Sequence, residues 1–211
     1  MNKKVAIIGS GDLGQHIGHY LLADKYAAHI VFYDDYAPKG EQKGVGVVMG
    51  KVADAASDFA ANVYDEMFLG IGYNHFAVRQ RLFEELSQSI TFGKFAHSSC
   101  FIDHTVRLGA GTVILPGCTF DRGASTGVNV FLNTGCTVAH DSHIGDHSFL
   151  GPAVTLAGFC QIGKRCFIGT GSVLIDHIAI ADDAQTGGGC VITKNITEAG
   201  LYVGVPARKI K

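Results

Sequence analysis

The sequence predicts two structural halves, a small α/β domain followed by a parallel β-helix built from triangular coils. Two patterns carry this prediction. In residues 1–92, short apolar runs alternate with segments of helical periodicity. In residues 93–211, the chain repeats with a period of six residues. We therefore assign one domain to each of these two segments.

The composition fits a globular protein that binds neither nucleic acid nor membrane. The chain has 211 residues, 47% of them hydrophobic, which is ample for a core. Its 17 basic and 19 acidic residues are mixed along the chain, so no basic stripe forms. The N-terminal run MNKKVAIIGSGDLG is interrupted by Gly, Ser and Asp, unlike a signal peptide. We expect a cytoplasmic protein.

The first half contains an alternation of strands and helices. Buried strands are expected at residues 4–9, 29–35 and 67–72, and helices at 13–23 and 74–89. The second of these helices is amphipathic, with Phe76, Leu82, Phe83 and Leu86 on one side. This alternation predicts a small parallel α/β sheet.

A glycine-rich loop joins the first strand to the first helix. It reads Gly9-Ser10-Gly11-Asp12-Leu13-Gly14, a complete G-x-G-x-x-G, and Asp34 and Asp35 follow at the end of the second strand. In this context glycines let the backbone approach a pyrophosphate at a helix N-terminus. The alternative is a tight strand-to-helix turn without a ligand. Because the segment holds only half of a dinucleotide fold, we favour a nucleoside diphosphate with a group attached over NAD.

The second half repeats strictly every six residues. Large or β-branched residues recur from Ala96 onward at Ile102, Leu108, Ile114, Phe120, Thr126, Leu132, Val138, Ile144, Leu150, Leu156, Ile162, Ile168, Leu174, Ile180, Thr186 and Ile192. Neither a helix nor a single strand has this period. Each hexad therefore supplies one flat face, three hexads close one coil, and the repeat predicts five to six coils.

All six cysteines occupy one position of the hexad, four residues after the apolar one. They are Cys100, Cys118, Cys136, Cys160, Cys166 and Cys190. An even number of cysteines can indicate disulfides or a metal site. A shared repeat position instead indicates small core residues selected for size, in agreement with a reducing cytoplasm.

Two segments give the chain a recognisable family character. The coils carry LNTGCTVAHDSHIGD and close in GLYVGVPARKI, after the glycine-rich half-domain. In this the chain resembles the bacterial nucleotide-sugar acyltransferases with hexapeptide repeats, which include sialic-acid O-acetyltransferases and the N-acetyltransferases of UDP-bacillosamine and GDP-perosamine pathways. The resemblance implies an α/β N-terminal Rossmann-like half-domain plus a C-terminal left-handed parallel β-helix. It also implies a homotrimer that binds acetyl-CoA between neighbouring subunits.

The resemblance assigns four residues to catalysis. His140 matches the family's catalytic base, and an imidazole, with an ordinary pKa near ~6.5, suits that task. Asp141 matches the acid that orients the histidine. Consecutive strand residues point to opposite faces, so this pair requires a corner at His140 or a partner across the subunit boundary. Asn133 matches a residue near the reacting amine, and the N–H of Gly158 matches an oxyanion donor.

The resemblance also assigns binding residues. Those for the nucleotide are Gly11, Asp12, Leu13, Asp34, Asp35, Gly72, Tyr73 and Asn74. Those for acetyl-CoA are Phe149, Thr170 and Gly188. The chain departs from many relatives at Leu13 and Phe149, where they have histidines. These two departures affect the expected contacts to the sugar phosphate and to CoA.

The predicted reaction is transfer of an acetyl group from acetyl-CoA to the amine of a UDP-4-amino-4,6-dideoxy sugar, without a metal. One alternative is O-acetylation of a sialic-acid-type sugar. Another is a zinc site like that of γ-class carbonic anhydrases, using His140, His143 and His147. These histidines occupy different hexad positions and should diverge, and a zinc enzyme would leave the glycine-rich loop without a role. A third alternative is a non-catalytic nucleotide-binding scaffold.

Overall fold

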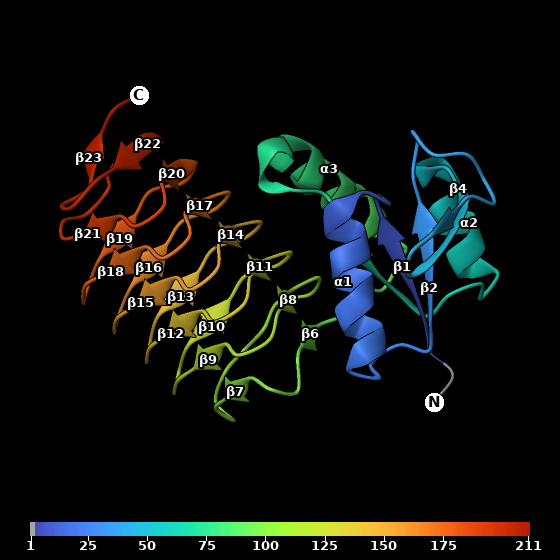
Figure 1. Ribbon diagram of the computed structural model, residues 1–211, viewed down its shortest axis with the longest axis horizontal. Coiled ribbons are helices and arrows are strands. Elements are labelled where there is room, and N and C mark those ends of the chain that lie inside the picture. The colour runs from blue at the N-terminus through green and yellow to red at the C-terminus, as the bar shows by residue number, and fades with distance from the viewer. Residues whose placement is uncertain (1–2) are drawn as a thin grey trace. The chain divides into compact units, whose positions relative to one another are not determined.

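The computed structural model describes residues 3–211 of the chain. The chain divides into two compact units, Met1–Phe95 and Ala96–Lys211 (Figure 1). Within the described residues, no helix has both the length and the apolar character needed to cross a bilayer. Each unit has its own architecture, and each is built from local features of the sequence.

The first unit is a five-stranded sheet with the strand order β3-β4-β2-β1-β5. Strands β4, β2, β1 and β5 run parallel to one another, and the edge strand β3 is antiparallel to β4. The strands are β1 (Lys4–Ile8), β2 (His29–Tyr33), β3 (Gln42–Lys43), β4 (Gly46–Gly50) and β5 (Glu66–Leu69). The helices are α1 (Asp12–Ala23), η1 (Val52–Asp54), α2 (Ala55–Ala60), η2 (Tyr73–His75) and α3 (Phe76–Leu86).

The predicted elements of this unit are present, although β1 and β2 end at Ile8 and Tyr33, one and two residues before the predicted ends, and three larger differences occur. The expected helix at 74–89 is a 3₁₀ turn, η2, followed by α3, which ends at Leu86. Strand β5 ends at Leu69, short of the predicted residue 72, because Gly70 turns the chain close to Gly14. The elements between residues 42 and 60 were not predicted. Strand β4 is bounded by glycines and α2 has only six residues, so neither shows a clear periodic signal.

The glycines of the first loop have three different structural roles. Gly9 has φ +91°, a conformation that glycine adopts without steric cost. A Cβ on Gly14 would overlap the carbonyl oxygen of Gly9, so the absence of a side chain there lets α1 pack closely on the sheet. A Cβ on Gly11 would meet no atom within 4 Å. The backbone at Gly11 is therefore open to an incoming ligand.

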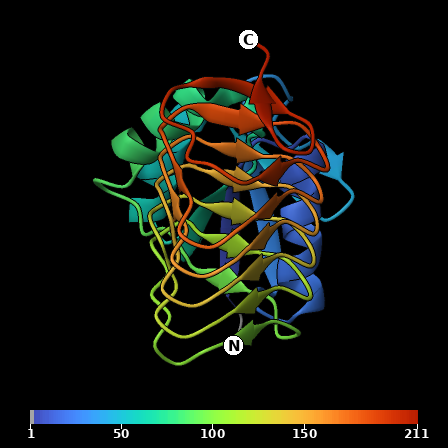
Figure 2. The same ribbon diagram turned by 90° about the vertical axis from the view of Figure 1, so that its left-hand side faces the viewer.

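The second unit is a β-helix whose three faces are sheets of short strands, most of them two residues long, stacked coil upon coil (Figure 2). The eight-stranded face consists of β6 (Phe95–Ala96), β8 (Val113–Ile114), β11 (Phe131–Leu132), β14 (Phe149–Leu150), β17 (Phe167–Ile168), β20 (Ala184–Thr186), β22 (Gly200–Val203) and β23 (Arg208–Lys209). The six-stranded face consists of β7 (Phe101–Ile102), β9 (Thr119–Phe120), β12 (Thr137–Val138), β15 (Thr155–Leu156), β18 (Val173–Leu174) and β21 (Val191–Ile192). The four-stranded face consists of β10 (Ser125–Thr126), β13 (His143–Ile144), β16 (Gln161–Ile162) and β19 (Ala179–Ile180).

Strand register confirms the predicted period. Phe131 pairs with Phe149, and Phe149 pairs with Phe167, so one coil takes three hexads. The predicted apolar residues end these strands and point into the core, where Ile114, Leu132 and Leu150 are fully buried. Burial of these aliphatic columns is the main stabilising contribution to the unit.

Every hexad between residues 111 and 189 turns through a left-handed backbone conformation at the third residue after the apolar one. Glycine fills this position in six of these hexads: Gly111, Gly117, Gly123, Gly135, Gly171 and Gly189. The others have Asn129, Asp141, His147, Ala153, Phe159, Arg165, His177 and Asp183, all with φ between 52° and 63°. This constraint was not predicted, although the glycines that recur at the position are its signal in the sequence.

The cysteines are free and line the core, as predicted, although Cys100 is only partly buried. Each thiol also lies within hydrogen-bonding distance of a backbone carbonyl of the next coil, as Cys136 does with Gly151 at 3.2 Å. Ser142 donates in the same way to Ala157. The cysteines and this serine therefore add a hydrogen bond between coils, whereas other hexads have a purely apolar residue at the position, such as Ala124 or Val154. Burial raises the pKa of the Cys166 thiol to about 12, which keeps it protonated and unreactive.

The second and third glycines of the loop, Gly11 and Gly14, should respond differently to substitution. Gly14→Ala should lower the free energy of unfolding by about 1–3 kcal/mol, because the new methyl group overlaps the Gly9 carbonyl. Gly11→Ser places its side chain in open space at the N-cap of α1, where serine is favoured, and should keep wild-type stability. Urea unfolding of both variants measures the difference. Equal stabilities would contradict the assigned roles.

Candidate active site

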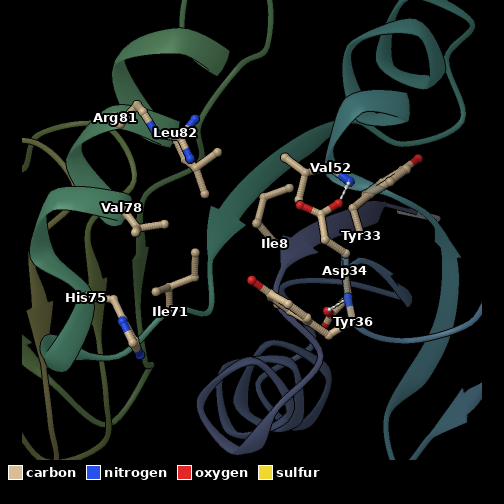
Figure 3. A pocket seen from close by; sticks show the side chains of 12 residues that line it. Ile8, Tyr33, Asp34, Tyr36, Val52, Ile71, His75, Val78, Arg81 and Leu82 are labelled. Carbon is tan, nitrogen blue, oxygen red and sulfur yellow. Dashed lines mark hydrogen bonds between the residues drawn. The ribbon is translucent and has the colours of Figure 1, made fainter.

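The first unit has a cavity at the carboxyl ends of its parallel strands. The loops after β1, β2 and β5 meet at this edge, since these strands are neighbours and parallel. The cavity has a volume of about 320 Å³ (Figure 3). Its lining residues are Ile8, Gly9, Tyr33, Asp34, Asp35, Tyr36, Val52, Ile71, His75, Val78, Arg81 and Leu82. An apolar cavity with a few polar groups is typical of small-molecule sites in open α/β sheets.

The two predicted aspartates of this edge have different environments. Asp34 accepts hydrogen bonds from the backbone N–H and hydroxyl of Ser10, at 2.7 and 2.6 Å. Its other oxygen accepts the N–H of Tyr36 at 2.8 Å. Burial alone would raise the pKa of Asp34, but these hydrogen bonds hold it below its ordinary value. Asp34 therefore fastens the glycine-rich loop to the end of β2.

Asp35 is more available to a ligand. Its side chain is exposed and accepts one hydrogen bond, from the N–H of Val52 at 3.0 Å. Lys51 donates to the backbone carbonyl of Asp35 at 2.7 Å, which holds the loop in place. Of the two acids, Asp35 is the one with carboxylate oxygen left to bind a base or ribose.

The other predicted nucleotide residues lie at the same edge but outside the cavity lining. Gly11, Asp12 and Leu13 begin α1, and Gly72, Tyr73 and Asn74 follow β5. A further wall of the cavity, which was not predicted from the sequence, comes from the end of η2 and from α3: His75, Val78, Arg81 and Leu82 line it. Their spacing of three and four residues is the helical signal that could have identified this face.

In the second unit, the predicted base lies at the corner between the six-stranded and four-stranded faces. We call this the histidine corner; it comprises Arg122, Gly123, His140, Asp141, Gly158, Phe159, Asp176 and His177, two residues from each of four successive coils. His140 Nδ1 lies 3.1 Å from Asp141 Oδ2. Asp141 has φ +58°, so the backbone turns at this residue and the pair forms within one chain. The corner required by the sequence argument is therefore present, one residue after His140.

The Asp141 carboxylate holds the histidine in a defined state. With Asp141 at Nδ1, the favoured tautomer has its proton on Nδ1 and a lone pair on Nε2, as a general base requires. Arg122 Nη2 lies 3.4 Å from the same carboxylate oxygen. Since 41% of the His140 side chain is exposed, its imidazole is accessible to a substrate.

Gly158 supports His140 in a way that the sequence analysis did not anticipate. A Cβ at this position would lie 2.7 Å from His140 Nε2, so the absence of a side chain makes room for the imidazole. The N–H of Gly158, the predicted oxyanion donor, instead donates to Asp176 Oδ1 at 3.0 Å. Oxyanion binding at this amide would require Asp176 to release it.

The remaining predicted residues lie elsewhere on the β-helix. Asn133 follows β11, and its side-chain oxygen accepts the N–H of Thr134. Thr170 and Gly188 are exposed in later coils at this same corner, between the eight-stranded and six-stranded faces, which we call the asparagine corner. Phe149 is 6% exposed and stacks on Phe131 with centroids 4.5 Å apart. Contrary to expectation, its ring offers little surface to a pantetheine arm.

The three histidines of the zinc alternative point to different surroundings. His140 pairs with Asp141, and His143 contacts the Ser125 hydroxyl from the four-stranded face. His147 is buried at the third corner beside Asn129. Across residues 3–211, no three His, Cys, Asp or Glu side chains are placed to hold a metal ion. This divergence agrees with the reasoning from hexad positions.

The role of Asp34 as a fastener predicts a pH dependence of stability. A carboxyl group with a lowered folded pKa stabilises the fold above its unfolded pKa, and this contribution is lost as the pH falls through the folded value. Asp34→Asn should therefore lower the free energy of unfolding at pH 7 by about 1 kcal/mol. Its stability should also fall less than that of the wild type between pH 5 and pH 3. Parallel wild-type and variant curves in urea titrations across this range would disprove the role.

Comparisons with known proteins agree with this architecture. Residues 4–86 match the PglD N-terminal domain family. The chain is similar to PerB from Caulobacter crescentus, solved with CoA and GDP-perosamine (27% identity, 100% of this chain and 99% of PerB covered, TM-score 0.89). It is also similar to a variant of GDP-perosamine N-acetyl transferase from the same organism, solved with the same two ligands (27% identity, 100% and 98% covered, TM-score 0.90).

A third similar structure is the acetyltransferase domain of PglB from Neisseria gonorrhoeae in complex with acetyl coenzyme A. It is 23% identical, with both chains covered completely and a TM-score of 0.90, and it supports the fold. No curated protein sequence matches the chain. The predicted fold class and family resemblance are thereby confirmed: the first unit matches the PglD N-terminal domain family, and the whole chain has the fold of the hexapeptide-repeat acetyltransferases of nucleotide-linked sugars.

Proposed function

We propose that the protein transfers the acetyl group of acetyl-CoA to the amine of a nucleotide-linked amino sugar, most specifically a UDP-4-amino-4,6-dideoxy sugar. The observation that carries this proposal is the full-length similarity to an N-acetyltransferase solved with CoA and GDP-perosamine. The accessible His140–Asp141 pair supplies the base that such a transfer needs.

The chemistry follows from the tautomer that Asp141 favours. Nε2 of His140 accepts a proton as the amine nitrogen attacks the thioester carbonyl, so a C–N bond forms while positive charge develops on the imidazole. Asp141 stabilises that charge. Collapse of the tetrahedral intermediate breaks the C–S bond, and the imidazolium returns the proton to the departing thiolate. The products are an N-acetylated sugar and CoA.

The cavity of the first unit is the proposed nucleotide site. Ile71 and Val78 offer apolar surface to a base, and Asp35 offers a carboxylate oxygen. The open backbone at Gly11, at the N-terminus of α1, suits a diphosphate. The uridine assignment rests on the sequence resemblance, whereas the relatives at 27% identity were solved with GDP-perosamine, so both nucleotides belong in the test.

A homotrimer is part of the proposal. His140 lies at the histidine corner, whereas Thr170 and Gly188 lie at the asparagine corner, one face of the prism away. An extended acyl-CoA held between two β-helices would bring the histidine corner of one close to binding residues of the next and bury more of the ligand. A cytoplasmic location is also proposed, and the six free cysteines support it.

The test is release of CoA thiol from acetyl-CoA with a panel of UDP- and GDP-linked 4-amino sugars and sialic-type hydroxyl acceptors. We expect turnover with a nucleotide-linked amine. His140→Ala should lower kcat by about 10²- to 10⁴-fold, the usual loss on removing a general base. His29→Ala is the matched control, since this histidine is exposed at the amino end of β2 and belongs neither to the histidine corner nor to the cavity lining.

Three results would count against the proposal. Turnover with hydroxyl acceptors alone would show that the reaction is O-acetylation and not N-acetylation. Nucleotide binding without thiol release from any acceptor would favour the scaffold. A His140→Ala variant with nearly wild-type kcat would remove the assigned base.

A further inference from the structure

Phe159 occupies a backbone position that rarely holds a large side chain. It lies at the histidine corner with φ +59°, in the left-handed region, and 44% of the residue is exposed. Bulky residues are uncommon in this region because Cβ crowds the following carbonyl. Strained positions of this kind cluster at functional sites.

The ring of Phe159 lies between two imidazoles. It meets the ring of His140 edge to face, with centroids 4.9 Å apart and an interplanar angle of 90°. Its other contact is with His177, whose ring is parallel within 5° at 4.7 Å. Both are favourable aromatic geometries. The stack extends from the proposed base along the corner over two further coils.

These contacts complete the surroundings of the proposed base. Asp141 contacts Nδ1, and the backbone of Gly158 lies beside Nε2. Phe159 covers a further side of the imidazole. A partly exposed histidine held by one carboxylate alone could change its rotamer. An aromatic ring packed against the imidazole restricts this rotation.

The β-helix itself does not require a ring at this position. The equivalent residue two coils earlier is Gly123, and glycine also fills this position in several other hexads. The polar residues that replace it elsewhere, such as Asp141 and Asp183, belong to types that tolerate the left-handed region better. The contacts with His140 and His177 are the structural feature that distinguishes Phe159.

We propose that Phe159, supported by His177, is a positioning residue that holds the His140 imidazole in its productive orientation. The inference rests on the proposed function of His140 as base. Loss of the ring should therefore slow the chemical step and leave acetyl-CoA binding nearly unchanged.

The test uses Phe159→Gly, which removes the ring and relieves the backbone at the same time, so loss of folding is not expected. Its kcat should fall by about 10- to 100-fold, as expected for a misoriented catalytic group, with KM for acetyl-CoA within about threefold of wild type. Phe159→Tyr keeps the ring and should recover most of kcat. Asp183→Gly makes the same backbone change at another corner and should retain wild-type kcat.

A double-mutant cycle separates positioning from direct substrate contact. In the His140→Ala background, Phe159→Gly should cause little further loss of kcat, because the residue acts through His140. An equal loss in both backgrounds, or a loss confined to KM, would overturn the inference and indicate a contact with substrate.

A crystal structure of Phe159→Gly tests the same inference without any assumption about the acceptor. The expected result is a His140 imidazole in more than one rotamer or displaced from Asp141. An imidazole unchanged from its wild-type position would overturn the inference, even if the enzyme proved active. Absence of turnover in the wild type, with His140 displaced in the variant, would instead disprove the proposed function and leave the positioning contact established.

Discussion

The second unit depends on one backbone constraint, a left-handed turn that recurs in every hexad between residues 111 and 189. Without this turn the flat faces would not meet, and the aliphatic columns ending at residues such as Leu132 and Leu150 would not share one core. The same turn also brings together the side chains of consecutive residues, which in a strand would point to opposite faces. At Asp141 it folds a carboxylate back onto His140, so the constraint that closes the prism also forms the proposed catalytic pair.

The first unit achieves an equivalent result through the close approach of backbones. Gly14 packs on the carbonyl of Gly9, and Gly70 approaches Gly14, which fixes the glycine-rich loop against the sheet edge. Asp34 fastens this loop to β2 through Ser10. The open Gly11 and the exposed Asp35 are then left at a rigid edge. In both units, residues that the fold requires surround a few polar side chains that it does not require, such as Asp35 in the first unit and His140 in the second.

The sequence predicted what depends on repetition and on one local motif. The six-residue period, the inward aliphatics and the core cysteines appeared as predicted because each is repeated many times. The role of Asp34 could not be predicted, since its partner Ser10 is 24 residues away and either acid could have taken it. The same holds for the amide of Gly158, which is engaged by Asp176 one coil later. The α3 wall of the cavity was missed because its helical spacing was interpreted only as packing.

The proposed function depends most directly on the histidine corner as the place of acyl transfer. A crystal structure of the protein with CoA and a nucleoside diphosphate sugar would test it. We expect the CoA sulfur and the sugar amine near His140 Nε2, at roughly the 3–3.5 Å separations of reacting atoms, and the nucleotide in the cavity beside Asp35. A CoA sulfur bound at a face or corner that does not include His140 would contradict it.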